Sequence, residues 1–246
     1  MPALVDWRYA QSTATLLGKT GPSASPAHAR EAVRSLRVLA AEAGEHVTAV
    51  TGLGAGVPLA PARVVDRHDW VAINAAGFGA VIEPALARSF PAAARGPLIR
   101  SVTTAATGIQ LGAAMALVSS RVLGQYELFA TTGGQLLLVA PNIMLAEQKL
   151  GVDPHDFRLW VCLHEVTHQL QFTAVPWLRG YFLSELEALL AIKSPLELLR
   201  SATARQKLSA MTALMTLVEG HAEYVMDAVG PQVVSYVAVI RKKFDA

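Results

Sequence analysis

The sequence predicts a mainly helical protein of the α+β class with one small sheet. Apolar residues recur at helical spacing along most of the chain, and one segment, Gln135–Val139, has the composition of a buried strand. The chain has 246 residues, of which 52% are apolar and only 16% charged, so it can bury a substantial core. We expect a helical region at 1–100 and a second region at 101–246, or one continuous domain.

Capping residues place the first two helices. One helix is expected over residues 5–18. The next has Ser25 as its N-cap and Pro26 at its first position, and its apolar face continues to about Ala43. The glycine-rich segment 51–58 then ends it as a loop. It lacks the glycine spacing of a dinucleotide-binding loop and does not follow a strand, so we do not expect a nucleotide there.

The middle of the chain contains a second strand signal and a set of breaks. Residues 62–67 favour a short strand, and Asp69 could cap the helix that follows. Three prolines predict the next connection: Pro84, Pro91 and Pro97.

The apolar segment 102–118 has Gly108, Gly112 and Ala116 four residues apart, a spacing that lets a neighbouring helix approach closely. Its apolar part is shorter than the roughly 20 residues that a membrane span needs, and Gln110 interrupts it. We therefore expect a helix buried in a soluble core and no membrane span.

The strand at Gln135–Val139 is bounded by two glycines and by Pro141. Proline just beyond a strand is typical of an edge position or of a strand end. From Asp153 onward the sequence is helical, with breaks at Pro176, Ser194–Pro195 and Gly230–Pro231.

Charge and cysteine content exclude several classes of protein. The net charge is +2 and the basic residues are scattered, so no nucleic-acid surface is expected. Cys162 is the single cysteine, which excludes an internal disulfide and fits a reducing compartment. The N-terminal residues, with Asp6, do not form a secretory signal. We expect a cytoplasmic protein.

The segment LHEVTHQLQF contains His164, Glu165 and His168. Residues four apart lie on one face of a helix, so both imidazoles can reach one metal ion. Zinc accepts imidazole nitrogen and tolerates an open position for water. Glu165 lies about 100° around the helix from His164, where it can act as a general base without binding the metal. A pair of buried core histidines is the alternative.

A third ligand is available in VEGHAEYVMD. Glu219 could bind the zinc from a second helix, and Glu223 or Asp227 could accept the other N–H of a ligating histidine. His221 lies on roughly the opposite side of that helix from Glu219, so it is a weaker candidate. The alternative is an acidic, solvated stripe. Cys162 lies two residues before His164 and faces away from the metal, so we expect it in the core.

The residue that stabilises an oxyanion is not determined by the sequence. The candidates are the tyrosines that could donate a hydrogen bond: Tyr126, Tyr181, Tyr224 and Tyr236.

The two segments LHEVTHQLQFTAVPWL and LVEGHAEYVMDAVGP resemble the bacterial zincin-like hydrolases, one branch of which is associated with biosynthesis of the deazaflavin coenzyme. The resemblance extends to residues 5–7, 64–74, 122–129 and 136–143. It implies a zincin-like catalytic region at 101–246. Family members usually run well past the IRKKF segment, whereas this sequence stops at Ala246. Either this is a shortened member, or a C-terminal part that could include a wall of the substrate cleft is missing.

The segment Glu219–Glu223 is also similar to the second motif of gluzincins. That resemblance implies that Glu219 is the third zinc ligand and that Glu223 supports a histidine. It further implies an edge strand beside the active-site helix, on which an extended peptide can pair. Only one segment is a good candidate for that strand, and its substrate-binding residues would be Gln135, Leu137 and Val139.

The leading hypothesis is a zinc-dependent hydrolase, most naturally a peptidase. One alternative is a zinc-binding scaffold or a relic site without activity, against which the intact Glu165 argues. The other is a hydrolase of small amides or esters in cofactor metabolism. The substrate, endo- or exo-cleavage and the oligomeric state stay open.

Overall fold

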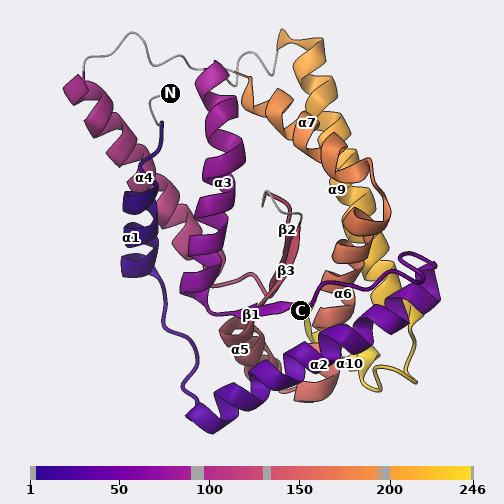
Figure 1. Cartoon of the computed structure of the whole chain (residues 1–246). Coiled ribbons are helices and arrows are strands. Elements are labelled where there is room, and N and C mark those ends of the chain that lie inside the picture. The colour runs from indigo at the N-terminus through magenta and orange to yellow at the C-terminus, as the bar shows by residue number, and fades with distance from the viewer. Residues whose placement is uncertain (1–3, 90–96, 130–133, 193, 195–199, 245–246) are drawn as a thin grey trace.

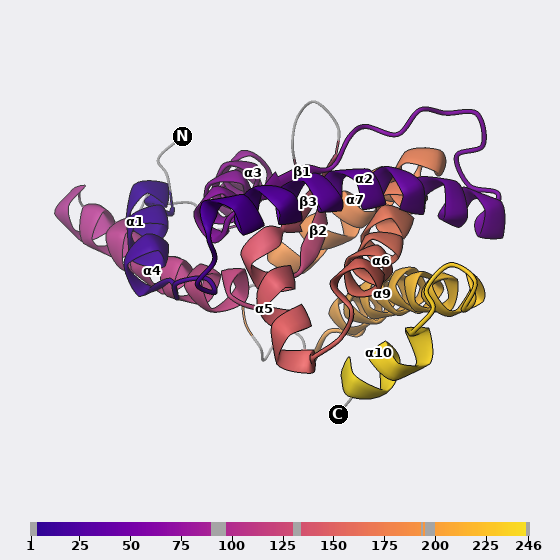
Figure 2. The same cartoon turned by 90° about the horizontal axis from the view of Figure 1, so that it is seen from below.

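The computed structural model of the chain describes residues 4–89, 97–129, 134–192, 194 and 200–244. Helices dominate these residues and surround one small sheet (Figures 1 and 2), as the sequence predicts. The helices are α1 Trp7–Leu17, α2 Pro26–Thr51, α3 Arg67–Ser89, α4 Pro97–Ser119, α5 Ala140–Leu150, α6 Pro154–Ala174, α7 Leu178–Leu190, α9 Ala202–Ala228 and α10 Val237–Phe244. The strands are β1 Arg63–Val65, β2 Gly124–Glu127 and β3 Gln135–Val139.

The three described strands form one mixed sheet in the order β1-β3-β2. β1 pairs with β3 in parallel, with Val64 opposite Leu138. β2 pairs with β3 antiparallel, with Tyr126 opposite Leu136. The core side chains of β3 are fully buried, which explains why it gave the clearest strand signal.

The predicted edge position of Gln135–Val139 is wrong, because β3 is paired on both sides. Pro141 marks a strand end instead: it lies in the first turn of α5, where a missing N–H costs nothing. A peptide therefore cannot pair with Leu137 or Val139, which have partners on both sides, and Gln135 is already paired with Glu127 of β2. The exposed edge nearer to α6 belongs to β2, which sequence reasoning did not identify as a strand.

Helix α6 lies in the middle of the main core. α2 and α9 pack against it, and β2 and β3 contact it as well. A buried ion pair joins it to α5, since Arg158 donates two hydrogen bonds to Glu147 at 2.7 and 2.9 Å. The core contains side chains from α2, such as Leu36, as well as from α6, such as Phe157. The regions 1–100 and 101–246 thus share one core.

The start of α3 differs from the prediction. Asp66, not Asp69, caps it: its carboxylate accepts from the Asp69 N–H at 2.8 Å, and its carbonyl accepts from Trp70. Pro84 lies inside α3 rather than in the connection. Pro97 begins α4, as a helix-starting proline can, and Pro91 lies outside the described residues.

Helices α1 and α4 lie side by side on the far side of α3 from α6 (Figure 1). A Cβ on Gly108 would lie 2.4 Å from the backbone oxygen of Asp6, the N-cap of α1, and a Cβ on Gly112 would lie 2.3 Å from that of Ala10. The small residues therefore do allow close approach. The expectation of a buried helix is wrong, however: only 22% of the window Ser101–Ser119 is buried. By length and composition alone that window could also cross a membrane, which is weak evidence for a single helix.

Candidate metal centre

The helix that carries the two histidines, α6, is capped at its N-terminus. Asp153 caps α6 by accepting from the Asp156 N–H at 3.0 Å, and Pro154 occupies the first turn. Apolar side chains bury nearly the whole of this helix, including Cys162, whose predicted place in the core is confirmed. Burial raises the pKa of the Cys162 thiol, so it is unreactive.

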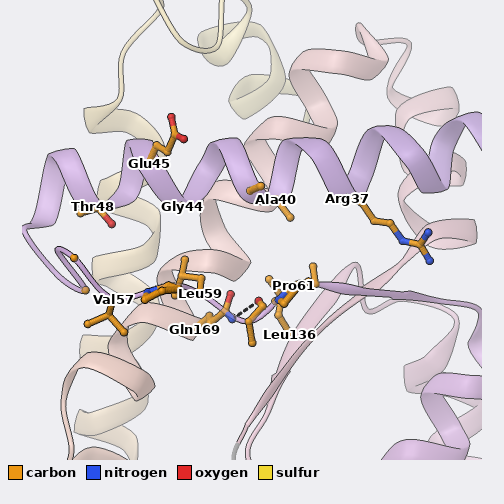
Figure 3. A pocket seen from close by; sticks show the side chains of 16 residues that line it. Arg37, Ala40, Gly44, Glu45, Thr48, Val57, Leu59, Pro61, Leu136 and Gln169 are labelled. Atoms are coloured by element: carbon orange, nitrogen blue, oxygen red, sulfur yellow. Dashed lines mark hydrogen bonds between the residues drawn. The ribbon is translucent and has the colours of Figure 1, made fainter.

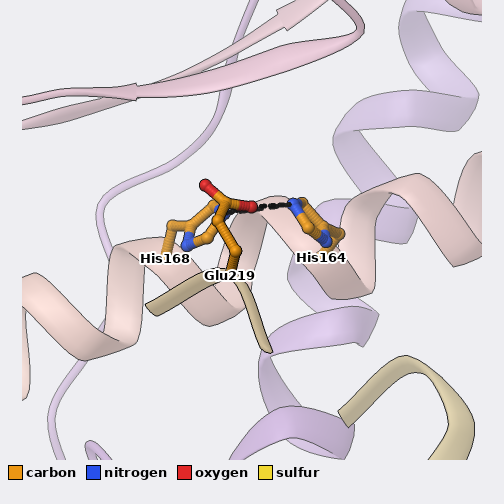
Figure 4. A group of neighbouring side chains, drawn as sticks. All are labelled: His164, His168 and Glu219. Atoms are coloured by element: carbon orange, nitrogen blue, oxygen red, sulfur yellow. Dashed lines mark hydrogen bonds and ion pairs between the residues drawn. The ribbon is translucent and has the colours of Figure 1, made fainter. Parts of the chain in front are cut away.

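The structure brings His164, His168 and Glu219 together at the crossing of α6 and α9 (Figure 4). The two Nε2 atoms are 3.1 Å apart. The Glu219 Oε2 lies 3.4 Å from the His164 Nε2 and 3.5 Å from the His168 Nε2. Donors bound at zinc distances to a tetrahedral ion would lie about 3.3–3.6 Å from one another. These three atoms therefore fit a small divalent metal.

Gln171 fixes the ring of His168, although sequence reasoning missed it. Its Nε2 donates to the Val218 carbonyl at 2.9 Å, and a carbonyl can only accept. The Gln171 Oε1 must then face the His168 Nδ1, at 3.0 Å, and accept its proton. This leaves the lone pair of His168 Nε2 directed at the site. The same Gln171 amide donates to the Nδ1 of His221, at 2.9 Å.

The expected support from Glu223 or Asp227 is wrong. The His168 Nδ1 bonds Gln171 instead, and the His164 Nδ1 lies 3.2 Å from the Met226 sulfur. Glu223 is exposed, and Asp227 accepts from Arg241 at 2.9 Å. The physical reason differs for the two histidines. Gln171 is one turn from His168 on the same helix, whereas the residue of α9 that faces His164 is the buried Met226, which lies between Glu223 and Asp227 in the sequence.

Glu165 lies beside the three candidate ligands and under strand β2. A Cβ on Gly124 would lie 2.6 Å from the Glu165 Cδ, so the backbone of Gly124 runs against this side chain. Burial raises the pKa of Glu165, and the charges of His164 and His168 offset the rise only in part. The Glu165 carboxyl therefore holds a proton more readily than an exposed glutamate does.

The three candidate ligands are electrostatically coupled. Hydrogen bonds from His164 and His168 hold the pKa of Glu219 well below its usual value. Burial lowers the pKa of His168, but the hydrogen bond to Glu219, the charge of Glu165 and the bond to Gln171 outweigh it, so its pKa is raised. A metal cation bound at the site would take the place of the protons that join the histidines to Glu219.

Two cavities open on either side of Glu165. One, of about 330 Å³, contains the three metal-site residues, Glu165 and several aromatic rings. The other, of about 290 Å³, is lined by Trp160, Glu223 and Arg241 among other residues. Of the tyrosines considered as oxyanion donors, Tyr126 lines the first cavity; Tyr181, Tyr224 and Tyr236 line none of the three cavities described.

A larger cavity, of about 550 Å³, lies between α2, the loop after it and another face of α6 (Figure 3). Its charged residues, Arg37 and Glu45, are exposed, and the Gln169 amide donates to the Ala60 carbonyl at 2.9 Å. The glycine-rich loop beside it follows a helix, as predicted, and has no helix N-terminus for a phosphate.

A second group of metal-type side chains occurs at the start of α6: Asp153, His155 and Asp156. Its carboxylates already serve the helix start, because Asp153 caps it and Asp156 accepts from the Tyr236 N–H at 3.0 Å. The group is therefore explained by its structural role.

Comparisons with known proteins agree with this site. The model of the zincin-like metallopeptidase family matches residues 5–194 and 190–246. A crystal structure of a candidate hydrolase with a novel fold from Chloroflexus aurantiacus is similar, with a TM-score of 0.73 and 29% identity over 98% of this chain and 74% of that one. No curated protein matches the chain. Because the family match extends over nearly every residue, the chain belongs to the zincin-like metallopeptidases.

Proposed function

We propose that the protein is a zinc-dependent peptidase in which His164, His168 and Glu219 hold the metal and Glu165 is the general base. One observation carries the proposal: three donor atoms 3.1–3.5 Å apart lie beside a buried carboxyl that does not belong to the set. A structural zinc site has no need of such a base. When bound, zinc lowers the pKa of a water towards ~7 and polarises a carbonyl.

Glu165 supplies the proton transfers of amide hydrolysis. Its carboxylate takes a proton from the attacking water as the new C–O bond forms. It returns that proton to the leaving nitrogen as the C–N bond breaks, which yields an acid and an amine. Its raised pKa suits both steps, since the group must accept and release a proton within one cycle.

The substrate lies along β2 in this proposal. The Val139 N–H donates to the Leu123 carbonyl at 2.8 Å, so residue 123 is a hydrogen-bonded position of the antiparallel pair. Positions alternate along such a pair, and Gly124 and Tyr126 therefore direct their N–H and C=O groups away from β3. An extended peptide can add a strand there, directly over Glu165.

Substitution of the base tests the proposal. Glu165→Gln keeps the size of the side chain and removes its basicity, so zinc content and melting temperature should stay close to those of the wild type. Hydrolysis of a peptide library should fall by at least ~10²-fold. Equal activity in the two proteins would refute the mechanism. A well-occupied site that cleaves no peptide would favour the scaffold or a hydrolase of small amides.

A further inference from the structure

The cavity beside the metal residues has aromatic walls drawn from three elements. Tyr126 of β2 stacks on Phe172 of α6, with 6.0 Å between ring centroids. Phe172 meets Phe182 of α7 at 6.1 Å, and Phe182 meets Phe129 at 6.5 Å. The rings thus support one another, and the wall exists before any ligand arrives. Such a preformed wall avoids the entropy cost of ordering side chains on binding.

A glycine sets the position of the first ring. A Cβ on Gly134 would lie 2.3–2.6 Å from atoms of the Tyr126 ring and hydroxyl, so the ring lies directly on the backbone of that residue. Tyr126 is half-buried there, and burial raises its pKa. It presents one side to the cavity and cannot turn further away from it.

Charge in this cavity is confined to one end. Apart from Tyr126, the ionisable lining residues that the structure describes are the metal-site histidines and glutamates. The remaining walls are mostly apolar and include Leu128, Met215 and Val218; the polar exception is Gln125, whose amide donates to the Asn74 Oδ1 at 2.8 Å. At about 330 Å³ the space is at the small end of the range for ligand pockets, roughly 300–1,000 Å³. A charged side chain held against the apolar walls, away from the metal-site end, would lose water without gaining a partner there.

Strand direction places this cavity on one side of the bond to be cleaved. Leu128 and Phe129 follow β2, whereas Val122 and Leu123, in the neighbouring cavity, precede it. Gly124 lines both cavities, next to Glu165. Antiparallel strand pairs are commoner than parallel ones. A peptide antiparallel to β2 has its N-terminal end near Phe129 and its C-terminal end near Leu123. Its residues before the cleaved bond then lie over the aromatic cavity.

We propose that this cavity is the specificity pocket, and that it selects a large apolar or aromatic side chain on the residue immediately N-terminal to the cleaved bond. The proposal rests on the peptidase function proposed above. Expected substrates are peptides with Phe, Leu or Met at that residue. Burial of such a side chain favours them over Ala by about 10- to 100-fold in kcat/KM.

The test uses zinc-loaded full-length protein and capped peptides that differ only in one central residue: Phe, Leu, Ala, Asp or Lys. Mass spectrometry locates the cleaved bond. Met215→Trp should fill the cavity, since Met215 lines it from α9 and is 36% exposed, enough to accept a larger side chain. Leu217→Trp is the matched control, because Leu217 is 70% exposed and does not line the cavity.

The expected result is cleavage directly after Phe or Leu, with a preference over Ala that Met215→Trp abolishes and Leu217→Trp retains. Equal rates for all five peptides, a preference for Asp or Lys, or selection of the residue after the cleaved bond would overturn the pocket and leave the peptidase intact. If no peptide is cleaved, the peptidase fails, and binding to zinc-loaded Glu165→Gln decides the pocket. The pocket is supported if the Phe peptide binds Glu165→Gln more tightly than the Ala peptide does and if this difference disappears in the double variant Glu165→Gln, Met215→Trp. Equal binding of the Phe and Ala peptides overturns it.

Discussion

The largest described cavity and the cavity that contains the metal-type residues adjoin different faces of helix α6. The second of these is the better candidate for chemistry. The larger, about 550 Å³, has a mostly apolar lining with exposed charges at Arg37 and Glu45. The smaller, about 330 Å³, has three metal-type donors within 3.5 Å of one another and a buried carboxyl beside them. Volume alone therefore does not identify a site; the convergence of donor atoms does.

Removing one carboxylate from each cavity should separate them most strongly. Glu219→Ala deletes a ligand and should weaken zinc binding roughly 10²- to 10³-fold, about a quarter of the ~10–16 kcal/mol typical of four-ligand zinc sites. Glu45→Ala should leave zinc binding as it is, because this exposed side chain faces the larger cavity. Competition with a coloured chelator measures both. Similar affinities for Glu219→Ala and the wild type would contradict the ligand assignment.

The second comparison replaces one glycine that lines each cavity with alanine. Gly124→Ala places a Cβ 2.6 Å from Glu165 and should lower kcat about 10²-fold by displacing the base. Gly44→Ala meets only the tip of Leu59, at 2.9 Å, so hydrolysis should be unchanged. Steady-state kinetics on zinc-loaded proteins of matched circular dichroism decide it. Full activity in Gly124→Ala would show that the strand does not approach the base.

Two glutamines of α6 provide the third comparison. Gln171→Ala removes the acceptor that orients His168 and should cost about 10- to 100-fold in zinc affinity. Gln169→Ala is the control, since the Gln169 amide bonds Ala60 in the larger cavity. The two variants differ only by position on one helix. Equal zinc affinities would mean that Gln171 has no part in holding the histidine.

The pH dependence of zinc binding should be the most gradual effect. The pKa of His168 is raised above its ordinary value of 6.5. The protonated imidazole therefore stabilises the folded chain at low pH, and this contribution is lost as the pH rises through the raised pKa. Zinc must displace this proton. Its affinity should therefore fall as pH decreases through the pKa, by up to about tenfold per unit. Titrations between pH 8 and 5.5 measure it, and a flat profile would exclude His168 as a ligand.

The three residues of the candidate site could be predicted from the sequence because helical spacing determines which side chains share a face. His164 and His168 needed only an intact helix, and the apolar residues around Glu219 indicated that its helix packs against another. The same rule places Gln171 one turn beyond His168, but nothing in its residue type marks it as a partner of a metal ligand, so the sequence prediction missed it.

The sheet was harder to predict, because strand order depends on partners distant in sequence. Nothing within Gln135–Val139 tells whether one or both edges are paired, and the four residues of β2 contain a glycine and a glutamate that weaken a strand signal. The exposure of α4 is a similar case. Its glycines predict a close neighbour, and α1 is that neighbour; α3 also contacts α4, but most of the window Ser101–Ser119 stays exposed.

The central claim is that His164, His168 and Glu219 bind one zinc ion. X-ray absorption at the zinc edge of zinc-loaded protein, with elemental analysis of the same sample, tests it most directly. The account predicts about one zinc per chain, coordinated by two imidazoles and oxygen ligands, and loss of one oxygen ligand or of the zinc itself in Glu219→Ala. A zinc with a single imidazole that persists unchanged in Glu219→Ala would place the metal at Asp153, His155 and Asp156 instead and contradict the claim.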